Sequence, residues 1–207
     1  STLIYFWDDC KKIIISLCNF KKDENFNFSI MILISMIPAG LVGFFYEDEI
    51  NKLFEGNLFL VGSMLIITAI LLFISDKVKN LNKELTAKNA LIIGIAQALA
   101  ILPGISRSGS TITTSIFLGV NRELAAKFSF LMVIPIIIGS SLKMIVFDDV
   151  VFNNEIILNY AVGFISALIT GFYACKWMIL FVKKSKLIYF SIYCLIIGLI
   201  SIFYTLL

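Results

Sequence analysis

Residues 89–120 read NALIIGIAQALAILPGISRSGSTITTSIFLGV, and this stretch decides the fold. It is apolar except for small polar residues and one charge, Arg107, which follows the pair Pro103-Gly104. Because proline ends a helix and glycine permits a tight turn, we expect two helices of about 14 residues, each about 21 Å long, with a tip between them. The pattern predicts a re-entrant helical hairpin over residues 89–120.

The composition of the whole chain indicates the surroundings of that hairpin. Of 207 residues, 59% are hydrophobic and 15% are charged. A soluble domain has about 45–50% apolar residues and about 25% charged residues. So few charges cannot cover a water-facing surface, which excludes soluble, disordered and fibrous proteins. Helices are the only open-chain structures that satisfy the backbone in lipid, so we expect an all-α, polytopic membrane protein. Residues 1–207 then form a single integral membrane domain.

Apolar runs predict where the chain crosses the bilayer. Most of them approach the length of about 20 residues that a spanning helix needs. They cover residues 29–46, 58–75, 89–120, 128–147, 156–182 and 187–207. With residues 89–120 assigned to the hairpin, about five spanning helices remain.

The charges between these runs predict an orientation. Lysines concentrate in residues 8–28, 76–88 and 176–186, whereas the acidic segments are residues 47–55 and 148–155. The positive-inside rule places the lysine-rich segments in the cytoplasm and the acidic ones outside. One net crossing must then separate Lys88 from Asp148, yet two apolar runs lie between them. A hairpin that enters and leaves on one side resolves the conflict, and a single long kinked helix is the alternative.

Residue types that are missing narrow the chemistry. The chain has no histidine, so it contains no imidazole base, acid or metal ligand. The four cysteines show no C-x-x-C spacing, and we expect no metal or redox site from them. The chain begins with Ser1, and its first apolar run, residues 3–7, is too short for a spanning helix or for the core of a signal peptide. We therefore expect the sequence to start partway through a membrane helix and to be N-terminally incomplete.

Arg107 is the strongest candidate for a functional residue. An arginine at membrane depth costs roughly 2.5–3.5 kcal/mol on insertion scales, so it marks a functional site by default and needs an anionic partner. No Asp or Glu occurs between Glu84 and Glu123, so the partner is a distant carboxylate or a ligand. A phosphate ligand is favoured, because Ser106 can cap a helix whose first amides attract anions and the guanidinium fits phosphate oxygens.

Other polar residues lie near this arginine in the sequence. Ser108 and Thr111 are spaced i, i+3, and Arg107 and Thr111 are spaced i, i+4, so we expect these groups to face one cavity. On the incoming helix, Gln97 either adds a hydrogen bond to a ligand or simply packs. The hydroxyl residues 113–115 are better explained by close helix packing.

The segment from Gly94 to Thr111, GIAQALAILPGISRSGST, strongly resembles the undecaprenyl-diphosphatase family, the bacterial bacitracin-resistance proteins. Residues 118–122 (LGVNR), residues 128–131 (FSFL) with the following Pro135, and residues 36–39 (MIPA) resemble the family as well. The likeness covers nearly the whole chain, and its P-G-x-S-R-S-G-x-T block is distinctive.

The resemblance implies a fold of two inverted repeats, each a re-entrant hairpin with three spanning helices, of which this chain is a truncated version. It implies hydrolysis of undecaprenyl diphosphate to undecaprenyl phosphate and inorganic phosphate, which recycles the lipid carrier of peptidoglycan synthesis and confers bacitracin resistance. It also implies a site near the midplane of the bacterial inner membrane, open to the outer face. A polyprenyl-phosphate transporter or flippase with the same anion pocket is the alternative.

The resemblance also assigns roles to residues. At matching positions the catalytic residues are Arg107 and Ser106, and the substrate-binding residues are Ser108, Thr111, Gln97 and Gly104. The family's glutamate-rich element and Gly-His pair have no match here, so we assign no metal ligand. A Mg²⁺ or Ca²⁺ cofactor would take its ligands mostly from a missing segment, and we expect this chain alone to be inactive. The expected partners are a polyprenyl diphosphate lipid and the bilayer, with a homodimer as an option and no nucleic acid.

Overall fold

The computed structural model describes residues 1–20, 23–54, 56–79, 81–147 and 154–206, and the regular elements in these ranges are helices. They are α1 (Thr2–Tyr5), α2 (Trp7–Cys18), α3 (Glu24–Phe45), α4 (Glu47–Leu53), α5 (Leu58–Asp76), α6 (Ala87–Leu99), α7 (Arg107–Phe117), α8 (Arg122–Phe147), α9 (Asn154–Lys183) and α10 (Ile188–Leu206). Within the described residues, α3, α5, α8, α9 and α10 contain segments long and apolar enough to cross a membrane. This confirms the predicted all-α, polytopic class.

The helix bounds differ from the apolar runs mainly at the polar ends. The fifth apolar run begins at residue 156, but α9 already begins at Asn154, and α8 begins at Arg122 rather than at residue 128. A capping hydrogen bond fixes the start of α3, where the Asp23 carboxylate accepts from the Phe26 N–H at 2.9 Å. Parts of the predicted charge pattern, residues 21–22, 55 and 148–153, lie outside the described residues.

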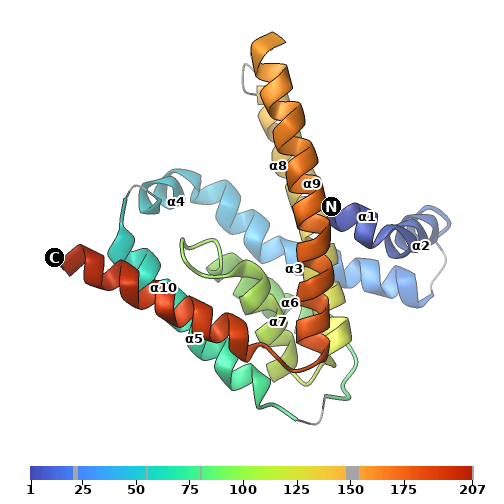
Figure 1. The fold of residues 1–207 in the computed structure, drawn as a ribbon. Helices are drawn as coiled ribbons and strands as arrows, with labels where there is room; N and C mark the ends of the chain where they lie inside the picture. The colour runs from blue at the N-terminus through green and yellow to red at the C-terminus, as the bar shows by residue number, and fades with distance from the viewer. Residues whose placement is uncertain (21–22, 55, 80, 148–153, 207) are drawn as a thin grey trace.

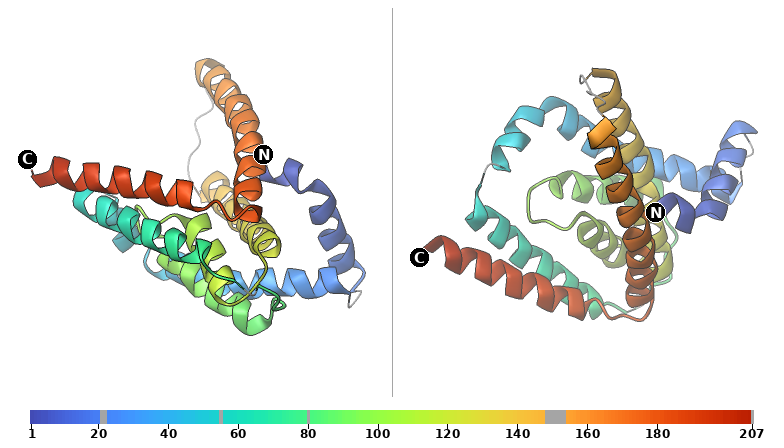
Figure 2. Two further views of the ribbon diagram at one scale, coloured as in Figure 1. Left: turned by 60° about the horizontal axis from the view of Figure 1, so that its bottom comes forward. Right: turned by 45° about the horizontal axis from the view of Figure 1, so that its top comes forward.

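Helices α5 and α10 form a close antiparallel pair, visible side by side in Figures 1 and 2. At one end Gly62 faces Gly198, and a Cβ on either residue would come within 2.8 Å of the other's carbonyl oxygen. Further along, the Ser191 hydroxyl donates to the Ala69 carbonyl at 2.7 Å. Small residues therefore let the two backbones approach closely, as in other membrane helix pairs.

Helices α6 and α7 form a hairpin between α3 on one side and the α5–α10 pair on the other (Figure 1). Helix α6 touches α3 closely, because a Cβ on Gly94 would lie 2.4 Å from the Ser35 carbonyl oxygen. The two ends of the hairpin meet, since the Lys83 N–H donates to the Gly119 carbonyl at 3.0 Å. The chain thus returns to the place where it started, as the loop charges required. Re-entry into a membrane stays a prediction.

Candidate functional site

The tip of the hairpin is a turn of residues 100–106 between α6 and α7. Gly104 has φ +95°, a left-handed conformation that favours glycine. A Cβ at this position would also lie 2.4 Å from the Val61 carbonyl oxygen of α5. Both backbone conformation and close packing therefore require glycine where the sequence places it. The predicted contact of Gly104 with substrate stays a prediction.

The tip lies against one half of α5, a candidate membrane span. The Ser106 N–H donates to the Thr68 hydroxyl of α5 at 3.2 Å. At 1.5 Å per residue, Thr68 lies about 12 Å along α5 from its end at Asp76, and Val61 lies about 22 Å from that end. The whole of α5 is 19 residues, or about 28 Å long. The turn therefore contacts α5 from near its midpoint, at Thr68, almost to its first residue, Leu58.

Ser106 caps α7, as the sequence predicted. Its hydroxyl oxygen accepts from the Gly109 N–H at 3.1 Å, and its carbonyl accepts from the Ser110 N–H at 2.8 Å. The N–H groups of Arg107 and Ser108 have no acceptor among the described residues. Two unpaired amides and the positive end of the helix dipole therefore remain at the tip, an arrangement that attracts anions.

The Arg107 side chain adds a full positive charge, directed from the start of α7 toward Gln97 of α6. It is half-buried, and its Nη1 donates to Gln97 Oε1 at 3.4 Å. Within the described part of the chain it has no carboxylate partner. Gln97 is only 1% exposed, and its Nε2 has no hydrogen-bond partner among the described residues. The charge is therefore available to a ligand, beside a buried amide that still has a donor to offer.

Thr111 bonds within α7 and to α8 rather than lining the cavity at the tip, and its role in substrate binding stays a prediction. Thr111 is 1% exposed, and its hydroxyl lies 2.6 Å from Ser129 Oγ on α8 and also donates to the Arg107 carbonyl at 3.0 Å. The cavity at the tip, of about 420 Å³, is lined by Ser106 and Ser108, but neither by Arg107 nor by Thr111. The reason is that Thr111 bonds back to its own helix and to α8, whereas Arg107 extends toward α6.

The roles of these residues in substrate binding and catalysis stay predictions, although their positions are now known. Thr113 and Ser115 are buried, and their hydroxyls donate to the carbonyls of Ser110 and Thr111 at 3.1 and 2.7 Å. These bonds within α7 fit the packing interpretation.

The divalent cation that the resemblance implies finds no site in the described part of the chain. No three His, Cys, Asp or Glu side chains come together there, and carboxylate oxygens are the usual side-chain ligands of Mg²⁺ and Ca²⁺. We therefore assign no step to a metal, and the cofactor stays a prediction.

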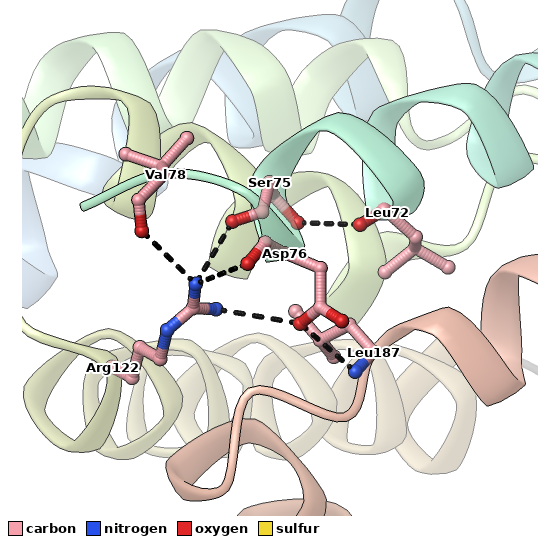
Figure 3. A network of polar contacts seen from close by, with 6 residues as sticks. All are labelled: Leu72, Ser75, Asp76, Val78, Arg122 and Leu187. Carbon is pink, nitrogen blue, oxygen red and sulfur yellow. Dashed lines mark hydrogen bonds and ion pairs between the residues drawn. The ribbon is translucent and has the colours of Figure 1, made fainter.

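The structure adds one residue that the sequence did not single out, Arg122 at the start of α8. It is 9% exposed, and its Nη2 donates to three carbonyls at the end of α5, those of Ser75, Asp76 and Val78, at 3.0, 3.1 and 3.3 Å. Its Nη1 lies 3.8 Å from Asp76 Oδ1, which also accepts from the Leu187 N–H at 3.1 Å. Figure 3 shows this network, which joins the starts of α8 and α10 to the end of α5 below the hairpin.

The whole chain can now be compared with known proteins. Residues 1–200 match the family described as Bacitracin resistance protein BacA. The chain belongs to this family.

Relatives extend over nearly the whole chain as well. An undecaprenyl-diphosphatase of Christiangramia forsetii is 47% identical over 204 residues, which cover 99% of this chain and 77% of the relative. One from Parabacteroides distasonis is 49% identical, and the match covers 100% of this chain and 79% of the relative. One from Methanococcus vannielii is 40% identical, and the match covers 94% of this chain and 78% of the relative. The resemblance that the sequence suggested is confirmed.

Proposed function

We propose that this chain acts in the hydrolysis of undecaprenyl diphosphate to undecaprenyl phosphate and inorganic phosphate. The observation that carries the proposal is Arg107, a cation without a carboxylate partner among the described residues, beside two unpaired amides at the start of α7. Its membership of the BacA family and the name undecaprenyl-diphosphatase that its relatives carry support the same conclusion. The transporter alternative finds no support in these comparisons.

The geometry suits phosphoryl transfer, which depends mainly on positioning and on stabilising spread negative charge. Arg107 supplies a planar donor fork for the oxygens of the terminal phosphate. The N–H groups of Arg107 and Ser108 add two fixed donors. The Ser106 hydroxyl accepts from Gly109, which leaves its own proton free to donate to a phosphate oxygen. These groups would hold the diphosphate while the terminal phosphorus–oxygen bond breaks and undecaprenyl phosphate leaves.

The protein is a multi-pass membrane protein, and we place it in the bacterial inner membrane with its site open to the outer face. The junction of Arg122, Asp76 and Leu187 brings the lysine-rich segments around residues 76–83 and 183–186 to one end. By the positive-inside rule this end is cytoplasmic, and the hairpin tip points away from it. Recycling of the lipid carrier for peptidoglycan synthesis and resistance to bacitracin follow from the same activity. Assembly as a homodimer stays a prediction.

The test is phosphate release from undecaprenyl diphosphate by the purified protein, expressed from its natural gene. We expect turnover in the unchanged protein and a loss of at least a hundredfold in Arg107→Ala, which is the scale for removal of one transition-state donor. Arg107→Lys should also be poor, because an ammonium group cannot reproduce the bidentate fork. Tight binding of the lipid without any phosphate release would instead support the transporter. Near-normal turnover in Arg107→Ala would reject the role of this residue.

A further inference from the structure

The cavity at the hairpin tip is polar at one end only. The polar end consists of the α7 start and its turn, with the hydroxyls of Ser106 and Ser108. The remaining walls are side chains of three spanning helices: Leu65 and Leu72 of α5, Met178 of α9, and Phe190, Tyr193 and Cys194 of α10. The cavity therefore offers the hydroxyl groups of the α7 start next to an apolar space, although Arg107 itself does not line it.

A second cavity, of about 520 Å³, lies beside α9 and shares two lining residues with the first. Its lining includes Gly171, Ala174 and Phe181 of α9 and Phe130 of α8. Met178 and Phe190 line both cavities, so these two side chains stand between them. The rings of Phe181 and Phe190 pack edge to face at 5.6 Å, which fixes one wall at the junction. We call the two cavities together the α9–α10 groove.

After its polar end the groove is lined mainly by apolar side chains, but Ser1 also lines the second cavity. No Asp, Glu, Lys or Arg side chain lines either cavity. Each cavity has a volume within the range of about 300–1,000 Å³ that is usual for small-molecule sites. An occupant must therefore combine an anionic head with a long hydrocarbon tail that reaches past Met178 and Phe190.

We infer that the α9–α10 groove holds the isoprenoid chain of the lipid diphosphate. This inference rests on the proposed function, and it adds where the tail lies. With the diphosphate at Ser106 and Ser108, the first isoprene units occupy the tip cavity and later units pass Met178 and Phe190 into the cavity along α9. A substrate with a short tail fills the tip cavity alone. The section beside Ala174 is thus the part that distinguishes long from short polyprenyl chains.

The test fills the far section of the groove and leaves the tip unchanged. Ala174→Trp places an indole in the second cavity, and Ala161→Trp, an exposed position of the same helix that lines no described cavity, is the matched control. Phosphate release is measured with undecaprenyl diphosphate and with farnesyl diphosphate, which carry the same head and differ in tail length. In parallel, an undecaprenyl diphosphate analogue with a photoreactive group on a middle isoprene unit is crosslinked, and the labelled peptides are identified.

We expect the preference for the long over the short substrate to fall about tenfold or more in Ala174→Trp and to stay constant in Ala161→Trp. The reason is that a single methylene group in an apolar pocket already changes substrate selectivity by about tenfold or more. The photoreactive analogue should label α9 in the unchanged protein and lose this label in Ala174→Trp. An equal preference in both variants, or labelling confined to other helices, would overturn the inference. Labelling of α9 without any phosphate release would refute the hydrolase and leave the groove intact.

Discussion

The buried Arg122 allows a quantitative prediction about what holds the base of the hairpin together. Its Nη2 has two hydrogens for three carbonyls, and its Nη1 faces the Asp76 carboxylate at 3.8 Å. Hydrogen bonds to a charged group contribute about 1.5–3 kcal/mol each. Removing one member of a buried ion pair costs about 3–5 kcal/mol, because the other charge stays buried. Arg122→Ala should therefore destabilise the protein by about 3–5 kcal/mol.

For a chain of this size each kcal/mol lowers the melting temperature by about 2–4 °C, so Arg122→Ala should melt about 6–20 °C lower. The assay is thermal unfolding in detergent with a thiol-reactive dye. Cys10, Cys175 and Cys194 are buried and become reactive when the protein unfolds, whereas Cys18 is exposed and gives a constant background.

The matched control is Lys183→Ala, which removes an ion pair at the same end of the molecule. Lys183 Nζ lies 2.7 Å from Glu123, but these side chains are 41% and 67% exposed. Exposed pairs contribute about 0–1 kcal/mol, so this variant should melt almost normally. Adding Asp76→Asn to Arg122→Ala should recover part of the loss, because the amide removes the orphaned charge and still accepts from Leu187. Equal melting temperatures for Arg122→Ala and Lys183→Ala would refute this account of the junction.

Further predictions concern the turn and the topology. Gly104→Ala should be strongly destabilised and should fail to bind substrate normally, because its Cβ would meet the Val61 carbonyl at 2.4 Å and φ is +95°. The control Gly139→Ala has nothing within 4 Å of the new Cβ and lies within α8, so its melting temperature should stay equal or rise. Cysteines placed at the exposed positions Lys83 and Asn121 should react with a membrane-impermeant reagent from the same, cytoplasmic, side of intact vesicles. Reaction from opposite sides would exclude the re-entrant hairpin.

The sequence was sufficient to predict the break in the hairpin because local chemistry determines it. Helix α6 ends at Leu99, four residues before Pro103, and Pro103 and Gly104 belong to the turn that keeps the two helices apart. Ser106 caps the next helix through a bond that spans only three residues. The helices among the described residues that are long and apolar enough to cross a membrane follow from apolar length alone. These features depend on neighbouring residues, so spacing and residue type predict them.

The direction of side chains around α7 could not be predicted, because it depends on residues far away in the chain. Thr111 faces Ser129 of α8, and Arg107 faces Gln97 of α6, although helical spacing alone allows both to face one cavity. From the sequence, Arg122 stood out only as the last residue of the family-like stretch at residues 118–122. The signal that could have singled it out is Asp76, an acid in a lysine-rich segment 46 residues earlier, but only the fold brings the two together.

The central claim, that the hairpin tip holds a lipid diphosphate, is tested most directly by a structure with a methylene-bridged, non-hydrolysable undecaprenyl diphosphate analogue in a lipid nanodisc. The account predicts that phosphonate oxygens lie within hydrogen-bond distance of the Arg107 guanidinium and of the first N–H groups of α7. A headgroup bound elsewhere, with Arg107 paired to a carboxylate of its own protein, would contradict it.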